Sequence, residues 1–151
     1  MKKILFLFAV TFFLFSSCSK YKDGPDFSLY SKTHRLCNTW VISQATETAN
    51  GVTTDKTTDY KTYYYEFEIT MYKNNGYTLD YLAFNLISYT ESGTWVYNGD
   101  KTHVFFTKTS SAPGSGLGTD WTILKLKEKE LWGSYVTNGT VVEIHFVPRF
   151  S

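Results

Sequence analysis

The stretch YYYEFEITMY, residues 63–72, decides the fold class, because its side chains alternate between two sets along the chain. Tyr63, Tyr65, Phe67, Ile69 and Met71 form an apolar set, and Tyr64, Glu66, Glu68, Thr70 and Tyr72 form a more polar one. Successive residues of a β-strand point to opposite faces of its sheet. The pattern therefore predicts a strand whose apolar set faces the protein interior.

The chain after Trp40 repeats this pattern in short runs. The same parity places on interior faces Tyr77, Leu79, Tyr81, Trp95, Tyr97, Leu124, Leu126, Val142, Ile144 and Phe146. The turn signals between the runs are Asn50-Gly51, Asn74-Asn75-Gly76, Glu91-Ser92-Gly93, Asn98-Gly99-Asp100, Lys127–Lys129 and Asn138-Gly139. Asn-Gly pairs tolerate the positive φ angles of tight hairpins, which predicts an antiparallel meander of about eight strands.

A meander with one interior face loses its exposed edges when it closes on itself. We therefore predict an all-β fold, an antiparallel up-and-down eight-stranded meander barrel with a short N-terminal helix. The helix is expected within residues 28–36, with Asp26 as its cap. A two-sheet sandwich remains an alternative, because the pattern alone does not prove closure.

The N-terminal segment has a different character. Lys2 and Lys3 precede an apolar stretch from Ile4 to Phe15, and the stretch leads into LFSSC, residues 14–18. This is the layout of a secretory signal, and LFSSC resembles the cleavage and lipidation site of bacterial lipoproteins. About twelve apolar residues fall short of the roughly 20 that span a bilayer. The resemblance implies cleavage before Cys18 and a lipid on its thiol, although Phe15 stands where that motif usually has Leu.

Residues 27–148 resemble the lipocalin-like lipoproteins of Gram-negative bacteria. The resemblance rests on LCNTW (36–40), on GTWVY (93–97), and on ILKL (123–126) followed by Glu130-Leu131-Trp132. Lipocalins carry Gly-x-Trp on the first strand, with the Trp at the barrel floor. Here Asn38 stands in place of the glycine, and Trp40 corresponds to the Trp. The resemblance implies a calycin-type barrel that binds a small hydrophobic or amphipathic molecule.

Three parts follow from these features. Residues 1–17 are expected to be the signal peptide, residues 18–26 the lipidated Cys18 and a flexible tether, and residues 27–151 the lipocalin-like β-barrel domain. An anchor at Cys18 places the domain at a membrane of the cell envelope. Ser19 favours the outer membrane of a Gram-negative bacterium, by resemblance to the sorting rule of enteric bacteria.

Composition and motifs predict no enzyme. The chain has 15 Lys and Arg against 14 Asp and Glu, a balance that favours neither nucleic acid nor an acidic substrate. The three histidines lack metal-ligand spacing, and the loop GSGLG (114–118) lacks the Lys of a phosphate-binding loop. We therefore predict no catalytic residue, no metal and no cofactor, and we expect a monomer. Cys37 is interpreted as a small apolar core residue.

The interior of the barrel is the remaining candidate site. An eight-stranded barrel either holds one small ligand or is filled by its own side chains. The predicted ligand-binding residues are Tyr65, Phe67, Tyr81, Trp95 and Tyr97. The alternative is a filled barrel that binds another envelope protein or a glycan, or that inhibits a hydrolase, through outward aromatics: Tyr64, Tyr72, Phe84, Phe106 and Trp132. A cavity of about 300 Å³ or more would favour ligand binding.

Overall fold

The computed structural model describes residues 29–110 and 115–150, so the predicted signal peptide and the whole tether with Cys18 lie outside the described residues. The helices are α2 (Lys32–Leu36) and α3 (Thr57–Tyr63). The strands are β1 (Thr39–Ala49), β2 (Val52–Asp55), β3 (Tyr64–Met71), β4 (Gly76–Ala83), β5 (Ile87–Tyr97), β6 (His103–Lys108), β7 (Asp120–Leu126), β8 (Leu131–Thr137) and β9 (Thr140–Pro148).

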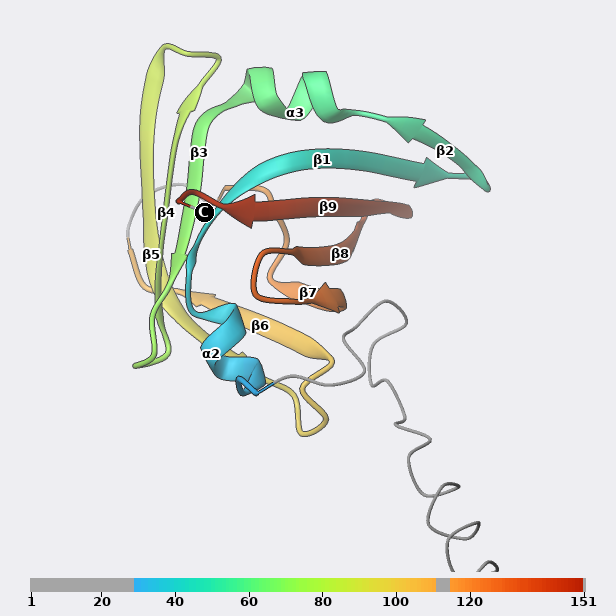
Figure 1. Cartoon of the computed structure of the whole chain (residues 1–151). Helices are drawn as coiled ribbons and strands as arrows, with labels where there is room; N and C mark the ends of the chain where they lie inside the picture. Colours follow the sequence, from blue (N-terminus) through green and yellow to red (C-terminus); the bar gives the residue numbers. More distant parts are fainter. Residues whose placement is uncertain (1–28, 111–114, 151) are drawn as a thin grey trace, which may run out of the picture.

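The strands form a closed antiparallel barrel. The order runs β1-β3-β4-β5-β6-β7-β8-β9, and β9 pairs back onto β1, from Trp40 opposite Pro148 to Thr48 opposite Val141. β2 lies outside this ring, paired only with the far half of β1, and it leads into α3 (Figure 1). The predicted eight-stranded meander barrel is confirmed, and the sandwich alternative is excluded.

The barrel floor is built around Trp40. Its side chain is 0% exposed, and its indole N–H donates to the carbonyl oxygen of Leu36 at 2.9 Å. That bond ties the first strand to α2, which lies across the same end of the barrel (Figure 1). The burial of Trp40 agrees with the place that the lipocalin resemblance gave it. Most of the residues predicted to face inward are buried, namely Phe67, Ile69, Met71, Tyr77, Leu79, Tyr81, Trp95, Leu126, Val142, Ile144 and Phe146.

A β-bulge in β3 makes part of the parity prediction wrong. The pairing of β3 with β4 shifts register between Tyr65 and Glu68, and Glu66 has a φ of 53°. An extra residue in one strand exchanges inward and outward positions beyond it. Tyr64 therefore packs against the core, while Tyr65 is 42% exposed and Tyr63 ends α3 at the surface. The prediction that Tyr63 and Tyr65 face the interior is wrong.

A second bulge shifts β7 between Ile123 and Lys125. Ile123 and Leu126 are buried on either side of it, and Leu124 is only half-buried. The predicted inward position of Leu124 is therefore wrong for the same reason.

The turn predicted at Glu91-Ser92-Gly93 is also wrong, because these residues lie inside β5. Gly93 is there because neighbouring strands come close. A Cβ atom at Gly93 would lie 2.2 Å from the carbonyl oxygen of Thr107 and 2.7 Å from the ring of Tyr77. The true β4–β5 turn has positive φ at Phe84 and Asn85, where no Asn-Gly pair marks it.

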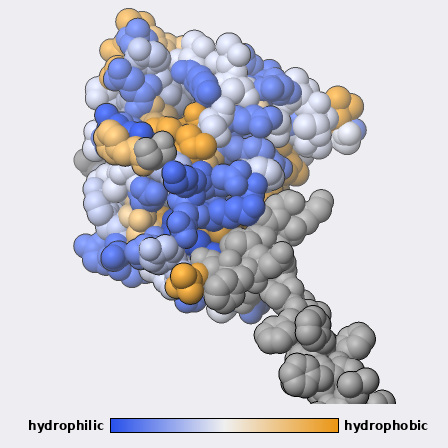
Figure 2. Space-filling view, in the orientation of Figure 1, coloured by the Kyte–Doolittle hydropathy of each residue, from blue (hydrophilic) through white to orange (hydrophobic). Residues whose placement is uncertain are grey.

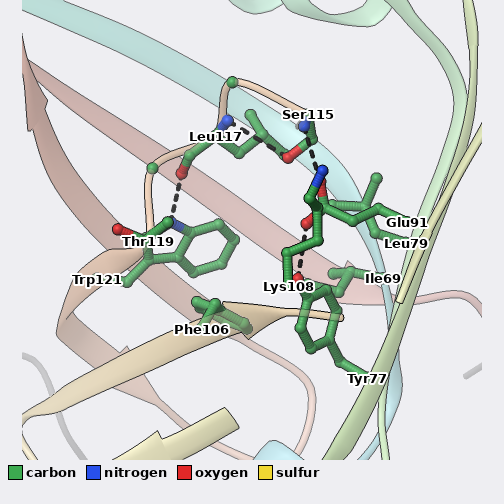
Figure 3. A pocket seen from close by; sticks show the side chains of 12 residues that line it. Ile69, Tyr77, Leu79, Glu91, Phe106, Lys108, Ser115, Leu117, Thr119 and Trp121 are labelled. Atoms are coloured by element: carbon green, nitrogen blue, oxygen red, sulfur yellow. Dashed lines mark hydrogen bonds between the residues drawn. The ribbon is translucent and has the colours of Figure 1, made fainter. Parts of the chain in front are cut away.

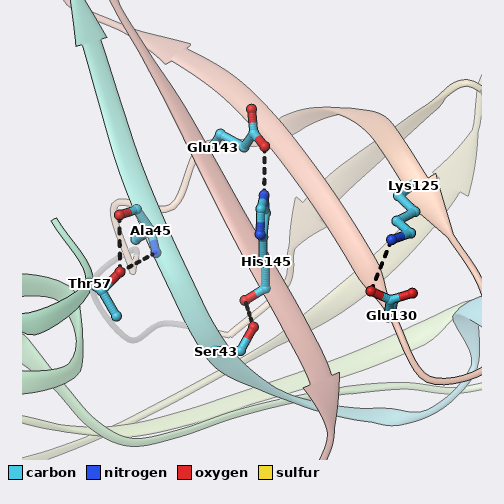
Figure 4. Close-up of polar contacts among 7 residues, drawn as sticks. All are labelled: Ser43, Ala45, Thr57, Lys125, Glu130, Glu143 and His145. Carbon is cyan, nitrogen blue, oxygen red and sulfur yellow. Dashed lines mark hydrogen bonds and ion pairs between the residues drawn. The ribbon is translucent and has the colours of Figure 1, made fainter. Parts of the chain in front are cut away.

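The helices differ from the prediction as well. α2 is shorter than expected, and its cap is Ser31, whose hydroxyl accepts from the N–H of His34, rather than Asp26. α3 was not predicted, and Thr57 at its start holds it to β1 by bonding the N–H and C=O of Ala45 (Figure 4). Among the described residues, no helix is long and apolar enough to span a membrane.

Cys37 follows α2 and is half-buried against the core, where burial raises the pKa of its thiol. Its partial burial agrees with the small apolar role predicted for it.

Candidate ligand cavity

A cavity of about 380 Å³ lies within the barrel, under residues 115–119, which precede β7 (Figure 3). Its lining comes from β3, β4, β5, β6 and β7 and from that segment: Ile69, Tyr77, Leu79, Glu91, Phe106, Lys108, Ser115, Gly116, Leu117, Gly118, Thr119 and Trp121. The volume lies above the limit of about 300 Å³ that separates a ligand pocket from a filled interior. The barrel therefore holds a cavity toward the end at which β6 ends and is filled at the Trp40 end.

The walls of the cavity are apolar and aromatic. Three rings are in edge contact, with centroids 5.2 Å apart between Tyr77 and Phe106 and 5.0 Å apart between Phe106 and Trp121. Ile69 and Leu79 add buried aliphatic surface from β3 and β4. In Figure 3 these side chains lie below the loop that carries Leu117. Such walls favour an apolar body of a ligand over water.

The roof of the cavity is the loop of residues 115–119. Leu117 is 1% exposed, and its carbonyl oxygen accepts from the indole N–H of Trp121. Gly116 and Gly118 have φ of 78° and 73°, angles that favour glycine. A Cβ atom at Gly118 would also lie 2.7 Å from the ring of Tyr135. The glycines thus let the backbone turn in over the barrel, and the described part of the motif, residues 115–118, forms a roof rather than a phosphate cradle.

One charged group is buried at the edge of the cavity. Glu91 is 8% exposed; its Oε1 accepts from the Tyr77 hydroxyl at 2.7 Å, and its Oε2 accepts from the Ser115 N–H at 2.8 Å. Burial and the bond to Glu91 raise the pKa of Tyr77, so this hydroxyl stays a donor at neutral pH. Lys108 contributes a second charge at an exposed position of the lining. The cavity therefore combines an apolar body with one polar end.

The five residues predicted to bind ligand do not line this cavity. Phe67, Tyr81 and Trp95 are buried elsewhere in the barrel. Tyr97 is half-buried and donates to the carbonyl oxygen of Lys32 near the floor, and Tyr65 is on the outside. Ligand contact by these residues stays a prediction, and the geometry offers a different set.

Sequence reasoning missed Glu91 and Phe106. Glu91 was interpreted as a turn residue, yet counting back by two from Trp95 through Gly93 reaches it on the interior face. Phe106 was predicted to face outward, but it packs against the core, as does Val104 two residues earlier. A prediction that started β6 at His103 would have placed Phe106 on the same interior face as Val104.

The five aromatic residues predicted to face outward do not form one exposed surface, so this prediction is wrong. Tyr64 and Phe106 pack against the core, and Trp132 is half-buried between His145, whose ring is stacked 4.0 Å away, and the ammonium of Lys125. Tyr72 and Phe84 are exposed. Apolar surface gathers instead at the β4–β5 tip, on Phe84, Leu86 and Ile87 (Figure 2).

Two histidines on the barrel strands each contact a carboxylate. His145 contacts Glu143 at 2.6 Å in Figure 4, and His103 contacts Asp120 at 2.9 Å. Within residues 29–110 and 115–150, no three His, Cys, Asp or Glu side chains come together to hold a metal ion.

Comparisons with known proteins give a fold and no family. The structure resembles a lipocalin-like protein from Bacteroides uniformis with a TM-score of 0.51 and 13% identity, over 76% of this chain and 98% of that one. A DUF4847 family protein from Bacteroides vulgatus aligns with a TM-score of 0.46 and 14% identity, over 75% of this chain and 93% of that one. No protein-family model matches the sequence. No curated protein matches it either. The chain has a lipocalin-like fold.

Proposed function

We propose that this chain is a non-enzymatic binding protein of the cell envelope, which holds one small amphipathic molecule in the cavity under residues 115–119. The observation that carries the proposal is the cavity itself, about 380 Å³ with aromatic and aliphatic walls and one polar end. Pockets of this size and lining are typical of small-molecule sites. The lipocalin-like fold is compatible with this role but does not establish it.

Location outside the cytoplasm is part of the same proposal. Its support is the LFSSC motif at residues 14–18, which resembles a lipoprotein processing site. The lipid on Cys18 would hold the barrel at the outer membrane, and the polar residues up to 26 would separate the two. In this arrangement the protein captures or stores a ligand near the membrane surface as a monomer.

The test uses two neighbouring phenylalanines on opposite faces of β6. Phe106 lines the cavity, whereas Phe105 is 39% exposed on the outer surface. Phe106→Trp narrows the cavity and is expected to weaken binding of the neutral fluorophore Prodan by about tenfold, which corresponds to about 1.4 kcal/mol. Phe105→Trp is expected to leave the affinity unchanged, because adjacent strand residues point to opposite faces.

The measurement is saturation of Prodan emission by the chain without its lipid, residues 19–151, after near-UV circular dichroism has shown that each variant is folded. Equal affinities of the two variants, or no saturable binding by the parent protein, would reject the cavity as a binding site.

A protein-binding role is the second candidate function. Its specific support is the β4–β5 tip, where Leu86 is 83% and Phe84 60% exposed. Leu86→Asp would abolish an interaction made through this tip and leave Prodan binding unchanged, because the tip is not part of the cavity lining.

A further inference from the structure

We infer that the cavity selects a ligand with a cationic, amine-type head group over neutral or carboxylate analogues, and that Glu91 is the residue that selects it. This inference rests on the proposed binding function and specifies the chemistry of the same site. It begins from one observation: the buried charge that faces the cavity is a carboxylate.

Glu91 is held in place by the fold. Tyr77 donates to one carboxylate oxygen from β4, and the Ser115 N–H donates to the other from the roof loop. Both oxygens act as acceptors in these bonds, which is the role of an ionised carboxylate. Each oxygen retains a further lone pair for another donor. The site is therefore built to accept hydrogen bonds from a ligand, and an ammonium group supplies up to three such donors.

The aromatic rings around the Glu91 carboxylate also favour a cationic head group. The ring of Tyr77 lies beside Glu91, and its neighbour Phe106 continues the aromatic wall (Figure 3). Aromatic faces attract cations through their quadrupole. A negative head group in the same place would meet the buried charge of Glu91 with little water between them. A fatty acid therefore fits this end of the cavity poorly.

Lys108 carries the opposite charge on the same cavity, so the relative strength of the two charges decides the selectivity. Lys108 is an exposed residue, and water and salt screen its charge. Glu91 is 8% exposed, so its field in the cavity is screened much less. Glu91 is therefore expected to dominate recognition of a head group inside the barrel, and the Lys108→Gln variant measures how far Lys108 opposes it.

The experiment compares three ligands that share one chain and differ in charge: decylamine, decanol and decanoate. Each displaces Prodan from residues 19–151 at neutral pH. Decylamine is expected to displace Prodan at about tenfold lower concentration than decanol, a difference of about 1.4 kcal/mol. Decanoate is expected to be the weakest of the three.

Glu91→Gln tests the assigned residue with little change of shape. Its amide oxygen accepts from Ser115 and its amide nitrogen donates to the Tyr77 hydroxyl, so both local bonds have replacements. In this variant the affinity for decylamine is expected to fall to within about twofold of that for decanol, a difference of about 0.4 kcal/mol. Lys108→Gln is the matched control, and it should keep or increase the preference for decylamine.

The outcomes separate the two proposals. Prodan binding without an amine preference, a preference for decanoate, or an amine preference unchanged in Glu91→Gln overturns this inference and leaves the proposed function intact. Absence of saturable Prodan binding overturns both. Should Glu91→Gln fail to fold, the ranking of the three ligands on the parent protein and on Lys108→Gln still decides the inference.

Discussion

At the residue scale, two buried tryptophans fix the two ends of the barrel through their indole N–H groups. Trp40 and Trp121 both donate from the indole N–H to a carbonyl oxygen four residues earlier, at Leu36 and Leu117. The two bonds resemble each other although they lie at opposite ends of the barrel. Trp40 fixes α2 on the floor, and Trp121 fixes the roof loop over the cavity. Buried indole N–H groups usually have such a partner, whereas the buried indole N–H of Trp95 has none among the described residues.

Buried tyrosines predict how stability depends on pH. Burial raises the pKa of Tyr60 and of Tyr81 to about 12, and it raises the pKa of Tyr64, Tyr77 and Tyr135 as well. An unfolded tyrosine has a pKa of about 10, so the folded state binds more protons above that pH.

Below about pH 10 these tyrosines are therefore expected to leave the free energy of unfolding independent of pH. As the pH rises from 10 toward 12, the free energy of unfolding is expected to fall. Urea midpoints between pH 8 and pH 12 measure this fall, and Tyr81→Phe should make it shallower. A midpoint that stays constant over the range would contradict the burial of these hydroxyls.

At the element scale, the sequence predicted strands well and bulges poorly. The parity of Phe67, Ile69 and Met71 correctly identified the interior face of β3, because alternation reports which face is buried. It failed at Tyr65, since a bulge leaves no signal in composition when its residue at positive φ is Glu66 instead of glycine. Glu91, the charged residue of the cavity lining, was missed for a related reason. Glu91 lies in a strand, but Ser92-Gly93 next to it has the composition of a turn.

The bulge in β3 gives a prediction of its own. Glu66 has a φ of 53°, which strains a residue with a Cβ atom, and its side chain is exposed. Glu66→Gly is expected to stabilise the protein by about 1 kcal/mol, because glycine adopts this conformation without strain.

Glu68→Gly is the control in the same strand. Glu68 lies in paired backbone opposite Asp80 and contacts Arg149, so this change is expected to destabilise the protein. Urea denaturation compares the two variants. Equal destabilisation by both would show that residue 66 carries no strain.

At the scale of the whole molecule, the barrel has two different ends. α2 and Trp40 close the end at which β1 begins, whereas the roof loop covers the end at which β6 ends. Four antiparallel pairings lead from β1 to β6, so these two strands point the same way. The start of β1 and the end of β6 therefore lie at opposite ends of the barrel. A chain that enters at α2 from a lipid anchor would therefore present the cavity end away from the point of attachment. Sequence alone predicted the closed barrel, but it did not predict which end holds the cavity, since this depends on a loop that folds inward.

The proposed anchor is tested on the full chain. Cys18→Ala is expected to abolish incorporation of labelled palmitate and to leave an uncleaved precursor, since the thiol is the predicted acceptor. Cys37→Ala is the matched control, because Cys37 is half-buried in the folded domain and should not affect labelling. Equal labelling of the Cys18 variant and the parent would exclude the lipoprotein interpretation.

A small amphipathic molecule is proposed to bind inside the barrel under residues 115–119. The most direct test is nuclear Overhauser contact between Prodan and methyl groups of the chain, because the cavity and the exposed β4–β5 tip carry different methyl-bearing residues. Contacts are expected to Ile69, Leu79 and Leu117, which line the cavity. Contacts confined to Leu86 and Ile87 at the exposed tip, or no contacts at saturating Prodan, would contradict this proposal.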